Sequence, residues 1–334
     1  MRVLLTGGTG FLGGRVAECL AGAGHEVVLV ARNPDSIGRS LPGIEVIQGD
    51  VCDVHALRPA LEGCTAVVHL AAVVKRWARD RSLFDRVNVE ATEALADLAA
   101  ELGIRRFLHC SSFMALGPTD GSPPVNEDAR HDREVRNDYE RTKLEADRNM
   151  RARQRRGEPI TIIYPGIVYG PGKMTDGNIL AGVAWDLLEG RLPGTLGPGD
   201  RRQCFAYVED VAQGFLAALE HPDPGFRYIL GGENLTVREA LVIMAEAGGV
   251  IVPRREIPYA VARMLGRMLR WRAHFFGIEP FLTDEEVRIS EHEWAYDSSL
   301  AQHDLGYQMT PVHEGLSIMI RWLIDEKIAH VRRH

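Results

Sequence analysis

Two groups of residues in this chain have types and spacings that suit chemistry, and the first is a set of glycines. Gly7, Gly10 and Gly13 follow a short apolar run, Val3 to Leu5, and precede a helical pattern. A strand, a glycine turn and a helix in this order form a phosphate-binding motif, because glycine lets the backbone approach a pyrophosphate and the helix N-terminus supplies free N–H groups. We therefore predict a dinucleotide site here, the alternative being a turn that uses glycine only for packing.

The second group combines a tyrosine and a lysine, in the run Tyr139-Glu-Arg-Thr-Lys143. Side chains four residues apart share one face of a helix, so the phenol and the ammonium group point into the same space. A nearby lysine favours the phenolate, which lowers the tyrosine pKa from its usual value of about 10 and allows proton exchange with an alcohol or carbonyl oxygen. The same spacing also occurs on ordinary solvated helices.

Two serines stand where a third reactive group is expected. Ser111 and Ser112 follow the expected strand Arg106 to Cys110. Ligands of a doubly wound sheet bind at the carboxyl ends of its strands, so a hydroxyl at this position can orient the reacting oxygen. A serine that ends a strand is also a common cap, and we expect one of the two to have that role.

The end of the second expected strand indicates which dinucleotide is bound. An NAD site usually has an acidic residue there, whereas this chain has Ala31 followed by Arg32. A guanidinium group can hold a 2′-phosphate through charge-assisted hydrogen bonds, which favours NADP(H). If Arg32 only caps a loop and stacks over the adenine, NAD(H) stays usable. Asp50 is placed either to accept a hydrogen bond from the adenine amino group or to close a turn.

Apolar runs alternate with helical patterns through the first half of the chain. The expected strands are 3–5, 26–30, 44–48, 66–70, 106–110 and 160–164, and the expected helices are 15–23, 54–61, 84–102 and 139–154. This alternation implies an α/β fold with a Rossmann-type doubly wound parallel sheet. We predict a dinucleotide-binding domain at 1–168, to which 205–230 returns, and a smaller C-terminal α/β substrate lobe at 169–204 and 231–334.

Composition narrows the class of protein. The 334 residues are 45% hydrophobic and 25% charged, with a formal net charge of −7, so a nucleic-acid partner is not expected. Five cysteines without a CxxC pair indicate reduced thiols and no metal site. No apolar run is long enough to span a bilayer, and a signal peptide has no room before the first strand. We expect a cytoplasmic protein without an integral membrane segment.

One later segment has an amphipathic pattern with two interpretations. Between Arg254 and Trp271, apolar residues such as Met264 and Met268 are interspersed with arginines such as Arg267. A basic amphipathic helix of this kind can lie on a membrane surface. It can also pack over a substrate cleft with its arginines in solvent, which is the interpretation we favour.

Several runs spread over nearly the whole chain match one family. They are Thr6-Gly-Gly-Thr-Gly-Phe-Leu-Gly13, His69-Leu-Ala-Ala72, Asn88-Val-Glu-Ala-Thr92, Ser111-Ser112, Tyr139 to Lys143 and Tyr164-Pro-Gly-Ile-Val-Tyr-Gly-Pro-Gly172. Together they resemble the extended short-chain dehydrogenase/reductases of the NAD-dependent epimerase/dehydratase superfamily. The runs 111–122 and 292–296 are particularly similar to dihydroflavonol-reductase-like proteins of the farnesol dehydrogenase type.

The resemblance implies a role for each matching residue. Ser112 is the expected catalytic serine, Tyr139 the acid/base and Lys143 its partner, while Asn88 is expected to organise the active-site helix. The other expected cofactor contacts are Gly7, Gly10, Phe11, Leu12, Gly13, Arg32, Asp50, Val51, Leu70, Ala71, Ala72, Ser111, Pro165, Gly166 and Val168, with Asn88, Tyr139 and Lys143 also counted. Relatives often dimerise through two helices, here 84–102 and 139–154, so a homodimer is expected.

The family contains both reductases and sugar-nucleotide epimerases or dehydratases, so the fold alone does not decide the reaction. Such epimerases usually carry an arginine directly before the segment that here reads Cys204 to Asp210, and this chain has Gln203 there, with Arg201 and Arg202 nearby. The sugar-nucleotide interpretation is weakened but stays open.

We favour an NADP(H)-preferring oxidoreductase that acts on a hydrophobic alcohol, aldehyde or ketone. Met114, Leu116 and the segment 185–188 would form its apolar pocket, unless they are plain core. The alternatives are a nucleotide-sugar epimerase or dehydratase with tightly bound NAD(P), and a cofactor-sensing protein without turnover.

Overall fold

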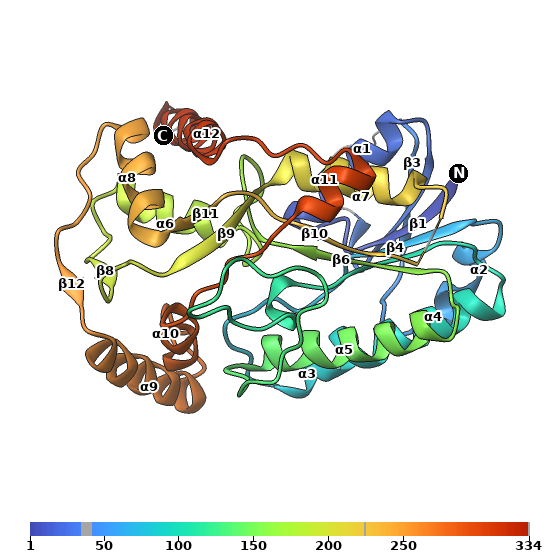
Figure 1. Ribbon diagram of the computed structural model, residues 1–334, viewed down its shortest axis with the longest axis horizontal. Coiled ribbons are helices and arrows are strands. Elements are labelled where there is room, and N and C mark those ends of the chain that lie inside the picture. Colours follow the sequence, from blue (N-terminus) through green and yellow to red (C-terminus); the bar gives the residue numbers. More distant parts are fainter. Residues whose placement is uncertain (35–41, 224, 333–334) are drawn as a thin grey trace.

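A parallel sheet of seven strands forms the centre of the molecule (Figure 1). The computed structural model describes residues 1–34, 42–223 and 225–332. The sheet order is β10-β6-β5-β4-β1-β2-β3, and the strands are β1 (Arg2–Thr6), β2 (Glu26–Ala31), β3 (Ile44–Gln48), β4 (Ala66–His69), β5 (Phe107–Cys110), β6 (Ile160–Pro165) and β10 (Arg227–Leu230). The predicted Rossmann-type sheet is confirmed. Its order reverses between β1 and β4, and ligands of such sheets bind in a crevice at the carboxyl ends of the strands on either side of the reversal.

Helices cover both faces of this sheet (Figure 1). One face carries α1 (Phe11–Gly22), α7 (Val208–Glu220) and α11 (Ser299–Leu305), and the other carries α2 (Arg58–Leu61), α3 (Ser82–Asp85), α4 (Ala91–Glu101) and α5 (Asp138–Arg155). Successive side chains of a strand point to opposite faces. Accordingly, Leu4 belongs to the core under α4 and α5, whereas Val3 and Leu5 belong to the core under α1 and α7.

Three predicted helices have different bounds in the structure. Helix α1 begins at Phe11 rather than at residue 15, because its glycines pack tightly against the turn before it. The expected helix 54–61 is a 3₁₀ turn, η2 (Val54–Leu57), followed by α2. The expected helix 84–102 is divided into α3, a π-helical turn η3 (Arg86–Glu90) and α4. Such turns have no distinct hydrophobic periodicity and often occur at functional sites.

The remaining elements pack at the other end of the molecule (Figure 1). Two small sheets contain β7 (Ile167–Tyr169), β9 (Arg202–Tyr207) and β11 (Asn234–Thr236), and β8 (Thr195–Leu196) with β12 (Glu256–Ile257). The helices are α6 (Ile179–Leu188), α8 (Val237–Gly248), α9 (Tyr259–Phe276), α10 (Asp284–Ser290) and α12 (Val312–Arg332). Within the described ranges, none of the helices has both the length and the apolar composition needed to cross a membrane. The division into two lobes stays a prediction.

Candidate active site

The glycine turn after β1 forms a cradle that side chains would obstruct. Gly7 has φ of +78°, and a Cβ atom there would lie 2.6 Å from the backbone nitrogen of Ala71. A Cβ atom on Gly13 would lie 2.2 Å from the carbonyl oxygen of Gly7. The start of α1 can therefore pack this closely against the turn only because residue 13 is glycine. Gly10 caps α1 without a side-chain hydrogen bond, and the first turn has no acidic residue. The uncapped N-terminus and the bare backbone fit a dinucleotide pyrophosphate.

The ends of β1 and β4 lie side by side in this crevice. The backbone nitrogen of Ala71 donates to the Thr6 hydroxyl at 3.3 Å, and that of Leu70 donates to the Thr6 carbonyl at 3.1 Å. His69 holds the same hydroxyl at 2.7 Å through Nδ1 and the Thr92 hydroxyl at 3.0 Å through Nε2. Burial, with a smaller effect of Lys143, lowers the pKa of His69 to about 3. A neutral imidazole therefore fixes this corner of the site.

Arg32 and Asp50 lie at the ends of the next two strands, where the adenosine end of the cofactor is expected. Arg32 is exposed, and no carboxylate pairs with it among the residues that the structure describes. Asp50 is exposed as well, and its Oδ1 accepts a hydrogen bond from the backbone nitrogen of Cys52 at 2.9 Å. Asp50 thus closes a turn, as one of its two expected roles requires. Val51, in the same turn, is half-buried.

The structure brings Ser112, rather than Ser111, to Tyr139. The Ser112 hydroxyl lies close enough to the Tyr139 phenol to lower its pKa. The Ser112 hydroxyl also accepts from the backbone nitrogen of Met114 at 3.2 Å and so begins the 3₁₀ turn η4 (Phe113–Ala115). The Ser111 hydroxyl is buried and has no hydrogen-bond partner in the described part of the chain. Ser112 therefore both caps a turn and faces the phenol.

The electrostatics of Tyr139 differ from the sequence-based expectation. Burial raises the pKa of Tyr139, and the nearby Ser112 hydroxyl lowers it by less. Lys143 donates from Nζ to the carbonyl oxygen of Cys110 at 2.7 Å, and burial lowers the pKa of this lysine. The net pKa of Tyr139 is therefore raised where the sequence predicted a lowered one, because desolvation of the phenolate dominates.

Asn88 connects the segment after β4 with the helix that carries Tyr139 and Lys143. It lies in the π-helical turn η3 and is 1% exposed. Its Oδ1 accepts from the backbone nitrogen of Val73 at 2.7 Å, and its Nδ2 donates to the Val73 carbonyl at 3.1 Å and to the Thr142 hydroxyl at 3.0 Å. Sequence reasoning missed Val73 and Thr142, since nothing in their spacing indicates a contact with Asn88.

Lys173 was also missed by the sequence analysis. It follows the matched run that ends at Gly172, and its Nζ donates to the carbonyl oxygen of Thr9 in the glycine turn at 3.0 Å. Phe11 packs against Gly172, where a Cβ atom would meet the Phe11 ring at 3.0 Å. The cradle for the pyrophosphate thus has a cation beside it. A lysine directly after a glycine-rich run was the available signal.

The other expected cofactor contacts lie along the same crevice or next to it. Pro165 ends β6, and Val168 lies half-buried in β7. Gly166, between them, packs against β9, because a Cβ atom there would lie 2.7 Å from the Cys204 carbonyl oxygen. Leu12 is half-buried and packs against the core under α1, and Ala72 is half-buried directly beyond β4.

The expected apolar pocket is mostly core. Met114 and Leu116 are 6% and 2% exposed and lie in the same buried cluster as Trp294 and Tyr296. In the segment 185–188, Leu187 belongs to the buried core around α6, α8 and α12. These residues stabilise the fold, so the alternative that they are plain core is confirmed for them.

The residues at the position of the epimerase arginine make contacts within the protein. They are Arg201, Arg202 and Gln203. Arg202 donates to both carboxylate oxygens of Glu293, at 3.0 and 2.9 Å, and to the carbonyl oxygen of Ser122 at 3.1 Å. Arg201 lies 3.7 Å from a carboxylate oxygen of Asp200. Gln203 is 7% exposed and donates to the His292 carbonyl at 3.2 Å.

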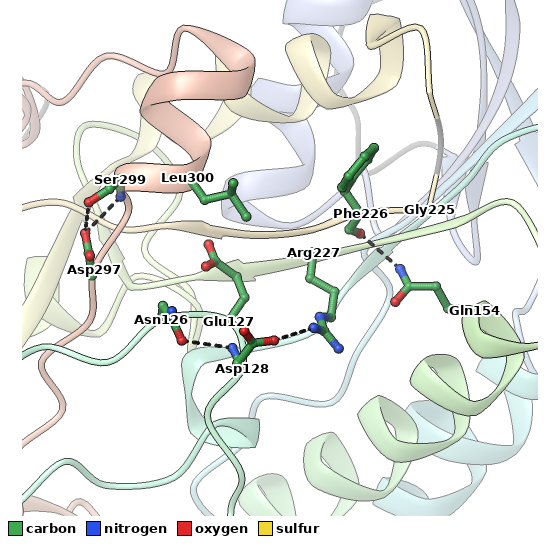
Figure 2. A pocket seen from close by; sticks show the side chains of 10 residues that line it. All are labelled: Asn126, Glu127, Asp128, Gln154, Gly225, Phe226, Arg227, Asp297, Ser299 and Leu300. Carbon is green, nitrogen blue, oxygen red and sulfur yellow. Dashed lines mark hydrogen bonds and ion pairs between the residues drawn. The ribbon is translucent and has the colours of Figure 1, made fainter.

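A cavity of about 570 Å³ lies elsewhere, beside the edge strand β10 (Figure 2). Most of its polar groups already have partners: Arg227 donates to Asp128 at 2.7 Å, and Gln154 donates to the Phe226 carbonyl at 3.2 Å. The glycine turn, where the dinucleotide is expected, lies at the centre of the sheet, between β1 and β4. The cavity in Figure 2 is therefore separate from the candidate active site.

A glycine cradle at the reversal point of a parallel sheet, with a serine, a tyrosine and a lysine beyond the neighbouring strands, defines a nicotinamide-dependent oxidoreductase. Residues 3–231 match the model of the NAD dependent epimerase/dehydratase family, and the chain belongs to that family. The resemblance to the extended short-chain dehydrogenase/reductases is confirmed, and the protein is an NAD(P)-dependent enzyme of that type.

Three known proteins illustrate the range of this family. Sterol demethylase protein B of Methylococcus capsulatus is 29% identical, over 96% of this chain and 98% of its own. The 3 beta-hydroxysteroid dehydrogenase/Delta 5→4-isomerase of Mycobacterium tuberculosis is 29% identical, over 92% of this chain and 86% of its own. The structure of DesIV, a dTDP-glucose 4,6-dehydratase from Streptomyces venezuelae with NAD bound, superposes with a TM-score of 0.76 at 24% identity and covers 97% of each chain.

Proposed function

We propose that this enzyme transfers hydride between NADP(H) and a hydrophobic alcohol, aldehyde or ketone, with Ser112, Tyr139 and Lys143 as its catalytic residues. The observation that carries the proposal is that the Ser112 hydroxyl lies beside the Tyr139 phenol, with Lys143 one helical turn further along α5. The nicotinamide supplies the hydride chemistry when it is bound. Gly7, Gly10 and Lys173 would hold its pyrophosphate.

Ser112, Tyr139 and Lys143 would have different roles in the proton transfer. Because burial raises the pKa of Tyr139, the phenol is protonated at neutral pH and is suited to donate its proton to a carbonyl oxygen that is being reduced. Ser112, which lies beside this phenol, would hold the same oxygen in place. Lys143 would stabilise the phenolate that forms, since opposite charges attract strongly in a site shielded from water.

Two observations support an apolar substrate over a sugar nucleotide. Arg202 is occupied by Glu293 and the Ser122 carbonyl, so its guanidinium group is not available for a nucleotide phosphate in this arrangement. The two curated relatives described above are named for sterol and steroid chemistry. The alternative, a nucleotide-sugar epimerase or dehydratase, has the fold of DesIV in its favour.

The choice of NADP(H) rests on Arg32. Its exposed guanidinium group has no carboxylate partner among the described residues and follows β2 directly, where Ala31 takes the position of the usual acidic residue. A free cation at this point would bind the 2′-phosphate of NADP(H).

The Tyr139→Phe variant tests the mechanism. It keeps the aromatic ring and removes only the hydroxyl, so turnover of steroid ketones and terpenoid aldehydes, followed by NADPH consumption, is expected to fall by about 10²–10⁴-fold. Tyr228→Phe is the matched control, because the Tyr228 hydroxyl is buried on β10 without a hydrogen-bond partner in the described chain. Undiminished turnover in Tyr139→Phe would disprove the mechanism. Isomerisation of UDP- or dTDP-sugars without net NADPH consumption would establish the alternative instead.

A further inference from the structure

Helix α9 lies at one end of the molecule (Figure 1, lower left), and most of its large apolar side chains are exposed. The buried residues of this helix are Ala262, Gly266, Leu269 and Ala273. The helix packs closely through them, since a Cβ atom on Gly266 would lie 2.4 Å from the backbone nitrogen of Asp284. Its exposed large apolar residues are Val261 (50% exposed), Met264 (69%), Met268 (59%), Trp271 (63%), Phe275 (60%) and Phe276 (69%).

Several arginines of α9 contact α10 instead of solvent alone. Arg270 pairs with Asp284 at 3.1 Å and with Glu285 at 2.5 Å, and Arg263 pairs with Glu291 at 3.2 Å. The favoured sequence-based interpretation, in which the arginines of this segment face water, is therefore wrong for these two. Carboxylates at the start of α10 and just beyond its end attract them, which leaves the apolar side of α9 outward.

The exposed apolar residues form one continuous face. Val261, Met264, Met268, Trp271 and Phe275 recur at intervals of three and four residues, so they share one side of the helix, which we call the α9 face. The rings of Trp271 and Phe275 touch, with centroids 4.5 Å apart. Exposed Ile278 and Phe281 follow the helix directly. Single exposed apolar residues are normal, but a continuous patch of this kind marks a binding surface.

Cationic residues border this face on both sides. On the helical repeat, Arg267 lies on one edge of the α9 face and Arg272 on the other. The Arg267 side chain is 65% exposed, although its Nε lies 3.6 Å from a carboxylate oxygen of Asp284. Arg272 is exposed without a carboxylate partner in the part of the chain that the structure describes. The helix contains no acidic residue.

We propose that the α9 face docks onto the surface of a bilayer that contains anionic lipids, with the helix axis in the plane of the membrane. The apolar side chains would enter the boundary between headgroups and acyl chains, while Arg267 and Arg272 extend to the anionic headgroups. Aromatic residues such as Trp271 suit this boundary.

Charge complementarity favours a lipid surface over a second copy of the chain. A symmetric dimer through the α9 face would place Arg267 and Arg272 against their own counterparts, with no carboxylate on the helix to compensate. Anionic headgroups neutralise the same arginines. Because the whole chain has a net charge of −7, an anionic surface would favour an orientation that presents the arginines of the α9 face.

Docking would also place the membrane beside the active-site segment that follows β4. Arg76 in that segment donates to the Phe281 carbonyl at 2.7 Å and lies 3.6 Å from Glu286 of α10. An apolar substrate that partitions into lipid would thus be concentrated near the site. This consequence rests on the proposed function, whereas the docking itself does not.

The experiment is flotation of the full-length protein with vesicles of phosphatidylcholine, with and without phosphatidylglycerol. We expect the wild type to float with anionic vesicles, and the double variant Trp271→Glu/Phe275→Glu to bind at least about tenfold more weakly. Arg272→Gln should bind anionic vesicles about fivefold more weakly. Val242→Glu is the matched control, because Val242 is a 39% exposed apolar residue on α8, and it should bind like the wild type.

The remaining outcomes are distinguishable. Failure of the wild type to bind anionic vesicles, or equal loss of binding in Val242→Glu, would overturn the proposal. So would a concentration-dependent dimer of the wild type that Trp271→Glu/Phe275→Glu dissociates while no vesicles are bound, since a second copy would then cover the face. Circular dichroism and turnover of a water-soluble substrate serve to show that the double variant is folded, so that weak binding by it reports the α9 face itself.

Discussion

Replacement of Asn88 by alanine tests how the active site is held together. The Asn88 side chain makes three hydrogen bonds, two with the backbone of Val73 and one with the Thr142 hydroxyl. Each contributes about 1 kcal/mol, and the site is too deeply buried for water to replace them freely, so Asn88→Ala should lower the free energy of unfolding by about 3 kcal/mol. Turnover should fall as well, because α5 carries Tyr139 and Lys143.

The assay is urea unfolding followed by tryptophan fluorescence, combined with a double-mutant cycle. Thr142→Val removes the hydroxyl that accepts from Asn88, and the cycle with Asn88→Ala should give a coupling energy of about 1 kcal/mol. The other bonds of the Thr142 hydroxyl, to the carbonyls of Asp138 and Tyr139, cancel in the cycle. A loss below about 0.5 kcal/mol for Asn88→Ala would refute the reasoning, because surface substitutions without structural contacts have effects of that size.

Three further predictions concern the cofactor and the dependence of stability on pH. Arg32→Ala should weaken the binding of NADPH by about 1.5–3 kcal/mol in calorimetric titration and leave the binding of NADH nearly unchanged. Equal losses of binding free energy for the two cofactors would show that Arg32 does not contact the 2′-phosphate. Lys173→Ala is the matched control. It should weaken the binding of NADPH and of NADH equally, by about 0.5–1.5 kcal/mol, since both contain the pyrophosphate that is expected near Thr9. Burial, helped by Lys143 and His69, holds the pKa of His109 well below its usual 6.5, so below that pH the unfolded chain binds more protons than the folded chain and stability falls as the pH falls. His109→Phe should flatten this decline by about 1.4 kcal/mol per pH unit, and an unchanged slope of unfolding free energy against pH would contradict the assignment.

The sequence by itself determined the features that depend on local geometry. Gly7, Gly10 and Gly13 predicted the turn, because only glycine permits such close approach of the backbone. Alternating apolar and helical patterns predicted the parallel sheet, since their periods follow from the geometry of strands and helices. The placement of Tyr139 and Lys143 on one helix also followed from spacing alone.

Only the tertiary structure decided which groups meet across the chain. The contacts of Asn88 with Val73 and Thr142, and the approach of Ser112 to Tyr139, join segments far apart in sequence. The raised pKa of Tyr139 depends on burial, which no residue spacing reveals. Periodicity likewise showed that α9 has two faces, but not which face contacts protein. The carboxylates of Asp284 and Glu285 determine which face of α9 contacts protein, because they pair with Arg270 and leave the apolar side of the helix exposed.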